Sequence, residues 1–170
     1  MQFFSLFEIP PQFAIDERAL DTKFRALQSQ THPDKFAAAS DAERRAAEQR
    51  SALVNDAYKT LKDPVARAAY LIEKSCGVDP FDERNTKMPA DFLMQQIELR
   101  EEIAENRAER NAEALEETLA RVQVEIKKSE GLVQGFLDDS HDYESATTEV
   151  RKLRFLSKVA SEIDETLAEI

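Results

Sequence analysis

The chain has 170 residues, of which 23 are Lys or Arg and 34 are Asp or Glu, and its net charge is −11. This charge argues against a nucleic-acid-binding protein, because contacts with phosphates need clustered basic side chains. The single cysteine, Cys76, excludes an internal disulfide and a multi-cysteine metal site, and the three glycines form no phosphate-binding loop. No signal peptide or membrane-spanning stretch is recognisable, so we expect a cytoplasmic protein with no membrane partner.

The first part of the chain is predicted to form three helices. The first helix has Asp16 as its N-cap and ends near Thr31, because a proline two residues later disfavours helical geometry before it. The second helix begins with a capping box at Ser40, and the third begins at Asp63, where a capping residue precedes a proline. A loop over 33–39 makes the first two helices an antiparallel hairpin.

The distribution of charge divides the chain into two units. Residues 1–76 carry 11 basic and 11 acidic side chains, whereas residues 77–170 carry 12 basic and 23 acidic ones. We expect the first unit over 1–76 and a linker over 77–90, where glycine and proline interrupt helices. The second unit, over 91–170, is predicted to be a three-helix bundle with helices at about 91–109, 111–133 and 142–169. No strand is predicted, so the expected fold class is all-α.

The loop of the hairpin contains His32, Pro33 and Asp34 in succession. Taken alone, this tripeptide has two interpretations: a helix stop with a capping Asp, or a His–Asp pair for acid–base catalysis. No Ser, Cys or metal ligand accompanies the pair in the sequence, so an enzyme is the least favoured hypothesis.

In its context the tripeptide resembles that of the J-domain, the module that activates the ATPase of DnaK-type heat-shock chaperones. It lies between an amphipathic helix and a second helix that continues NDAYKTLKDPVAR over 55–67. The resemblance covers about residues 1–76 and implies that the turn and the preceding helix dock on the ATP-bound chaperone, with His32, Pro33 and Asp34 as the activating residues. Basic side chains on the outer face of that helix and beyond the turn either meet an acidic chaperone surface or are ordinary solvated charges: Arg18, Arg25 and Lys35. Thr31 stands on the core face where many J-domains have Tyr, and the basic face is thinner than in general-purpose J-proteins.

The helix over 91–109 has two apolar surfaces. Phe92, Leu99 and Ile103 lie within about 40° of one another and form the predicted core face. Off this face lie three apolar and three acidic side chains: Leu93, Met94, Ile97, Glu98, Glu101 and Glu105. On the last helix, Phe155 also points roughly 100° away from the core stripe. Leu93, Ile97 and Phe155 either fill the three-helix core or its contact with the first unit, or they belong to an exposed partner site.

Four segments resemble the HscB family, J-proteins devoted to iron–sulfur cluster assembly: FSLF (4–7), HPDKFA (32–37), FLMQQIELREE (92–102) and RKLRFL (151–156). The resemblance covers essentially the whole chain and implies a co-chaperone with no catalytic residues of its own. It implies that the J-domain stimulates an HscA-type ATPase and that the bundle delivers the cluster scaffold IscU. The scaffold-binding residues that it implies are Leu93, Met94, Ile97, Glu98, Glu101, Glu105 and Phe155.

A different client for the bundle, such as an unfolded chain, is the second hypothesis. It is less favoured because the sequence has no Gly/Phe-rich linker and no paired Cys-x-x-Cys modules. With one cysteine and two histidines, His32 and His141, we expect no cofactor and no zinc or cluster site, so the cluster stays on the scaffold. We expect Cys76 to be a buried or half-buried residue at a helix end.

Overall fold

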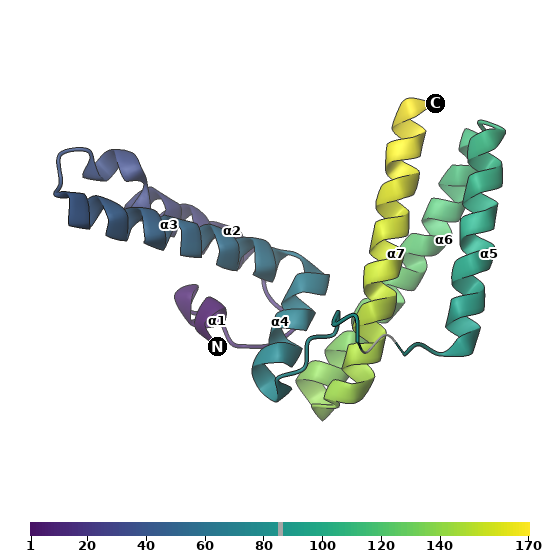
Figure 1. Ribbon diagram of the computed structural model, residues 1–170, viewed down its shortest axis with the longest axis horizontal. Helices are drawn as coiled ribbons and strands as arrows, with labels where there is room; N and C mark the ends of the chain where they lie inside the picture. Colours follow the sequence, from purple (N-terminus) through teal and green to yellow (C-terminus); the bar gives the residue numbers. More distant parts are fainter. Residues whose placement is uncertain (85–86) are drawn as a thin grey trace.

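The computed structural model describes residues 1–84 and 87–170, and these ranges contain helices and no strand, as expected for an all-α protein. The N-terminal part comprises α1 (Gln2–Leu6), α2 (Glu17–Thr31), the 3-10 turn η1 (Pro33–Phe36), α3 (Asp41–Lys62) and α4 (Pro64–Cys76). The C-terminal part comprises α5 (Ala90–Ala108), α6 (Ala112–Gln134), the π-helical segment η2 (Gly135–Ser140) and α7 (Tyr143–Glu169) (Figure 1). The expected linker over 77–90 includes residues 85 and 86, which lie outside the described residues.

The helices begin at the predicted capping residues. The carboxylate of Asp16 accepts a hydrogen bond from the backbone N–H of Ala19 at 3.0 Å. Ser40 and Glu43 form the reciprocal capping box at the start of α3, and Asp63 caps α4 just before its proline. Each cap satisfies an amide of a first turn, which has no partner within its own helix.

The N-terminal part is built on the hairpin of α2 and α3, which run antiparallel (Figure 1). Phe24 of α2 stacks on Tyr58 of α3 with ring centroids 3.8 Å apart. At the base of the hairpin, the carboxylate of Asp21 accepts hydrogen bonds from the hydroxyl of Tyr58 and the ammonium of Lys62, both at 2.9 Å. These contacts fix the pairing of the two helices and leave their connecting loop at the free end.

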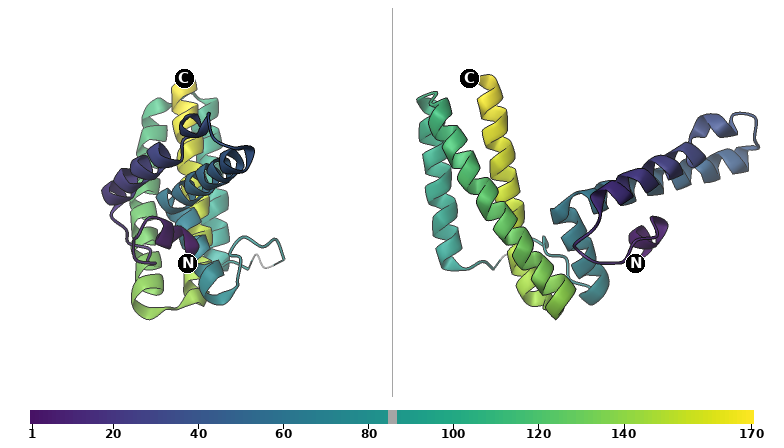
Figure 2. Two further views of the ribbon diagram at one scale, coloured as in Figure 1. Left: turned by 90° about the vertical axis from the view of Figure 1, so that its left-hand side faces the viewer. Right: turned by 180° about the vertical axis from the view of Figure 1, so that it is seen from behind.

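The C-terminal part has the predicted three helices. Figure 2 shows α6 and α7 as a long antiparallel pair, with α5 lying along the half of this pair that points away from the N-terminal part. A hydrophobic cluster holds them together through Ile103 of α5, Leu115 and Val122 of α6, and Val159 and Ile163 of α7. The apolar stripes read from the sequence are therefore the faces that meet in this bundle.

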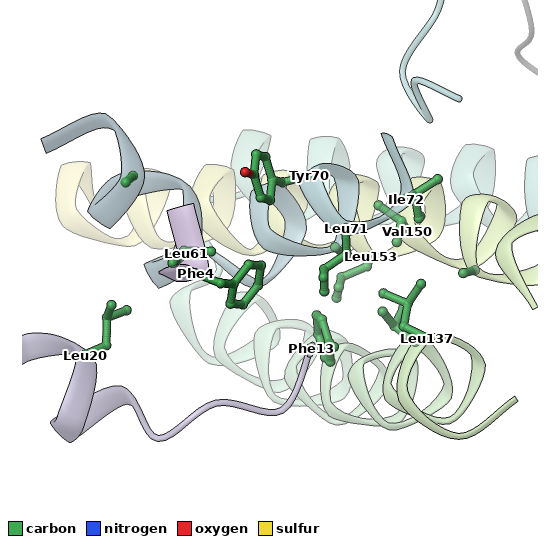
Figure 3. Close-up of a cluster of buried hydrophobic side chains, with 14 of the residues drawn as sticks. Phe4, Phe13, Leu20, Leu61, Tyr70, Leu71, Ile72, Leu137, Val150 and Leu153 are labelled. Carbon is green, nitrogen blue, oxygen red and sulfur yellow. The ribbon is translucent and has the colours of Figure 1, made fainter. Parts of the chain in front are cut away.

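A second, larger hydrophobic cluster joins the two parts. It extends from α1, α3 and α4 into η2 and α7, and Figure 3 draws Leu71 of α4 together with Leu153 of α7 within it. Phe13, Leu137 and Val150 belong to the same cluster and are almost fully buried. Because each large apolar side chain buried in this way contributes roughly 1.5–3 kcal/mol, the shared core holds the two parts against each other.

Three features differ from the sequence-based expectations or were missed by them. The short helix α1 was not predicted, although it brings Phe4 into the core. The second helix of the bundle continues beyond the predicted stop at 133 through η2 and ends where His141 adopts a left-handed conformation with φ 53°. The prediction for Cys76 was wrong: it is exposed, because α4 ends there and Gly77 turns the chain away in a left-handed C-cap.

No helix in the described ranges combines the length and the apolar character that crossing a membrane requires.

Candidate functional site

The tripeptide predicted to contact a chaperone lies at the free tip of the α2–α3 hairpin. His32 ends α2 in an extended conformation, and η1 starts at Pro33. The imidazole Nδ1 of His32 accepts a hydrogen bond from the backbone N–H of Asp34 at 3.3 Å and lies 3.5 Å from its carboxylate. All three side chains are exposed, so the turn presents a proline-fixed pair of polar groups to solvent.

The residues around this turn have different environments. Thr31 is buried on the core side, as predicted, and its hydroxyl donates a hydrogen bond to the carbonyl of Leu27 at 3.0 Å. Lys35 and Arg25 are exposed, and the guanidinium Nε of Arg25 donates to the carbonyl of Asp21 within the same helix. Arg18 is exposed in the first turn of α2, at the other end of that helix. The basic side chains therefore follow α2 along its length instead of gathering at the turn.

The predicted partner surface on α5 carries large exposed apolar side chains. Leu93 is 45%, Met94 60% and Ile97 58% exposed, so the interpretation that Leu93 and Ile97 fill the core is wrong. The three acidic members of the set are exposed beside them: Glu98, Glu101 and Glu105. We call these six residues the α5 surface.

The sequence left open whether Phe155 of α7 lies in the core or on an exposed surface, and its position has features of each. Its ring is half-buried and packs edge-on against Phe92, with centroids 5.7 Å apart and planes at 88°. The guanidinium of Arg100 lies over the same ring, 5.5 Å from its centroid. Phe155 thus belongs in part to the core of the bundle and in part to its surface.

A groove of about 580 Å³ runs between α5 and the α6–α7 pair. Glu98 of the α5 surface and Phe155 are among its lining residues. On its inner wall the hydroxyl of Ser129 donates a hydrogen bond to the buried carboxylate of Glu149 at 2.7 Å. The sequence analysis missed this polar pair, because the two residues lie on different helices and neither stands out in its own segment.

The sequence analysis also missed a basic cluster on α7. Arg151, Arg154 and Lys158 are spaced at i, i+3 and i+7, which places them on one helical face. This spacing is a signal in the sequence, within a second unit whose net charge is negative.

The two candidate sites lie at opposite ends of the molecule. In Figure 1 the hairpin tip lies farthest from the bundle, and α5 is the outermost helix on the other side. In the described ranges, no group of three or more His, Cys, Asp or Glu side chains is arranged to hold a metal ion. The two candidate sites are therefore separate surfaces on parts of the chain that share one hydrophobic cluster.

Comparisons with known proteins agree with this arrangement. The family model described as "DnaJ domain" matches residues 2–70, and the one described as "HSCB C-terminal oligomerisation domain" matches residues 88–164. The co-chaperone protein HscB homolog of Burkholderia multivorans is 48% identical over 160 residues, which cover 94% of this chain and 90% of that protein. The HscB homolog of Cupriavidus taiwanensis is 45% identical over 165 residues, which cover 97% of this chain and 93% of that protein.

Two solved structures have the same architecture. The chaperone HscB from Vibrio cholerae has a TM-score of 0.85 at 38% identity, covering 97% of this chain and 96% of that one. The human co-chaperone protein HscB has a TM-score of 0.84 at 32% identity, covering 95% of this chain and 80% of that one. A DnaJ domain implies a chaperone of the Hsp70 type as partner and a regulatory role rather than an enzymatic one. The chain belongs to the HscB family of J-domain co-chaperones, whose members serve iron–sulfur cluster assembly.

Proposed function

We propose that this co-chaperone presents an IscU-type scaffold protein to an HscA-type chaperone and stimulates the ATPase of that chaperone. The observation that carries the proposal is the α5 surface, where exposed apolar side chains stand beside carboxylates on a domain remote from the hairpin tip. A cytoplasmic setting is part of the same proposal.

The chemistry of the α5 surface suits a folded partner. Leu93, Met94 and Ile97 supply apolar anchors, which release water on contact and account for most of the affinity of a typical interface. Glu98, Glu101 and Glu105 would orient the partner and raise the association rate through complementary charge. In this proposal Phe155, which Phe92 holds edge-on, provides a preorganised rim.

The chaperone contact is assigned to the hairpin tip. His32, Pro33 and Asp34 form a defined, exposed turn, and the exposed guanidinium groups of Arg18 and Arg25 on α2 together with Lys35 would meet an acidic chaperone surface. Binding both partners on one rigid body raises the effective concentration of scaffold at the chaperone. The cluster itself remains a cargo of the scaffold and is not ligated by this chain.

The direct test is calorimetric titration of the full-length chain with a purified IscU-type scaffold. We expect the double variant Leu93→Ser/Ile97→Ser to bind at least about tenfold more weakly, a loss of about 1.4 kcal/mol or more. The matched control is Val78→Ser/Val124→Ser, which also removes two exposed apolar side chains and lies outside the α5 surface. The control should bind as the unmodified chain does.

Two results would contradict the proposal. One is unchanged scaffold affinity in the α5 variant when its helical circular dichroism and melting temperature are also unchanged. The other is no binding of folded scaffold together with suppression of aggregation of a denatured protein, which would favour the unfolded-client hypothesis.

A further inference from the structure

A second pocket, distinct from the groove between α5 and the α6–α7 pair, lies where the segment after α4 passes over α7. Its volume is about 330 Å³. The rings of Phe81 and Phe155 form apolar walls, and four basic side chains line it: Arg100, Arg151, Arg154 and Lys158. We call this the basic pocket. Phe155 lines both the groove and the basic pocket, so the basic pocket adjoins the region assigned to the scaffold.

The basic side chains are held in place mainly by groups that do not neutralise them. The guanidinium of Arg151 donates hydrogen bonds to the carbonyl oxygens of Pro80 at 2.6 Å and Lys87 at 3.1 Å. The guanidinium of Arg154 lies over the ring of Phe81, 4.2 Å from its centroid. These contacts orient the two arginines without supplying a carboxylate.

One of the four basic side chains is neutralised within the fold, because Glu162 pairs with Arg100 at 2.9 Å. Asp82, the one acidic residue among the lining residues, pairs with Arg84 at 2.8 Å, outside the lining set. Within residues 1–84 and 87–170, neither Arg154 nor Lys158 makes an ion pair. The basic pocket therefore keeps unbalanced positive charge on Arg151, Arg154 and Lys158, in a chain whose net charge is −11.

This arrangement favours a short anionic ligand over a long one. Charges more than about 8 Å apart are largely screened at physiological ionic strength, so a ligand confined to the basic pocket is governed by the local cations. A polynucleotide would extend beyond it and meet the acidic remainder of the surface. Arginine forks match carboxylates in paired hydrogen bonds, and the phenylalanine rings can pack against the aliphatic stems of acidic side chains.

We propose that the basic pocket binds the carboxylate side chains of an acidic peptide segment, supplied by the protein that docks on the α5 surface. Which protein supplies the acidic segment rests on the proposed function, whereas recognition of acidic side chains by the basic pocket does not. The basic pocket thus adds a charge-specific contact of opposite sign to the glutamates of the α5 surface. A partner with adjacent basic, apolar and acidic patches could bind the α5 surface through its basic and apolar patches and the basic pocket through its acidic patch.

The test uses a tetraglutamate peptide with blocked ends, titrated into the isotopically labelled full-length chain and followed by backbone amide chemical shifts. We expect saturable shifts in the α7 segment from Arg151 to Lys158 and none with tetraglutamine. The variant Arg154→Gln/Lys158→Gln should weaken binding at least about tenfold. The control Arg110→Gln/Lys127→Gln removes the same charge at exposed positions outside the basic pocket and should change affinity less than about twofold.

The proposal is overturned by any of three results: no shifts at millimolar peptide, equal weakening in both variants, or tighter binding of a short single-stranded oligonucleotide at the same residues. The variant Leu93→Ser/Ile97→Ser separates this proposal from the function above. It should retain tetraglutamate binding even if the scaffold does not bind to the α5 surface.

Discussion

The carboxylate of Asp138 accepts a hydrogen bond from the backbone N–H of Phe13 at 2.6 Å, across 125 residues of sequence. Its other oxygen accepts from the N–H of Ala14 at 2.9 Å. Both amides lie in the non-helical stretch before α2, where no helix supplies partners for them. A side chain of η2 therefore fixes a backbone segment of the J-domain and reinforces the shared hydrophobic core.

Replacing Asp138 should weaken this attachment. We expect Asp138→Ala to lower the free energy of unfolding by about 1–3 kcal/mol, because two backbone amides lose a charged acceptor. Urea denaturation followed by circular dichroism measures the change. Asp139→Ala, at the exposed neighbouring position, is the control and should stay within about 0.5 kcal/mol of the unmodified chain. Equal effects of the two substitutions would show that the Asp138 bonds contribute nothing specific.

The hairpin tip and the α5 surface are expected to act separately. His32→Gln should abolish stimulation of the HscA-type ATPase, because the imidazole that orders the turn through the N–H of Asp34 is lost. Scaffold affinity should not change, since the substitution is remote from α5. ATPase assays and calorimetry measure the two properties. His141→Gln, the same substitution at the other histidine, should preserve both; parallel loss of both properties in His32→Gln would contradict the two-site division.

The contact at the base of the hairpin predicts a loss of stability in acid. Hydrogen bonds from Lys62 and Tyr58 hold the pKa of Asp21 below its ordinary value of 3.8. A lowered pKa in the folded state gives stability that is present above the unfolded pKa and is lost as pH falls through the folded pKa. Denaturation at a series of pH values should show Asp21→Asn to be less stable than the unmodified chain at pH 7. The difference should shrink below pH 3.8; a difference independent of pH would contradict the prediction.

The partly buried carboxylate of Glu130 predicts an effect of the opposite sign. Burial raises its pKa above the ordinary value of 4.5, although the positive charge of Arg67 opposes the shift. A raised pKa favours the neutral side chain in the fold, so any stabilisation is present at low pH and lost as pH rises through the folded pKa. We expect Glu130→Gln to be more stable than the unmodified chain at pH 7, with a smaller gain at pH 4.

The control for Glu130 is Glu116→Gln, at an exposed position of the same helix, and chemical denaturation at both pH values measures the difference. A destabilised Glu130→Gln at pH 7 would mean that the attraction to Arg67 outweighs the cost of burial.

Local chemistry explains why much of the fold was predictable. Asp16, Ser40 and Asp63 mark helix starts because their side chains cap amides within three residues, so the signal lies in a short stretch of sequence. The exposure of Leu93 and Ile97 was suggested by the helical period, because both point away from the face shared by Phe92 and Ile103. Helical periodicity alone does not show whether another element covers Leu93 and Ile97.

Contacts between distant segments account for what was missed. The burial of Phe4 and Phe13 depends on α4, η2 and α7, which follow much later in the chain. Cys76 is exposed because, within residues 1–84 and 87–170, no element covers the end of α4. The basic pocket likewise arises because Pro80 and Phe81 pass over α7, which helical periodicity cannot show.

The core shared by α4, η2 and α7 has a consequence for how the hairpin tip and the α5 surface are spaced. The distance between the hairpin tip and α5 is fixed by side-chain packing rather than by the contour length of the connecting segment. The two parts are therefore held together by packed side chains and not only by the segment that connects them. Any reorientation of α5 relative to the hairpin tip would require the buried side chains of that core to separate.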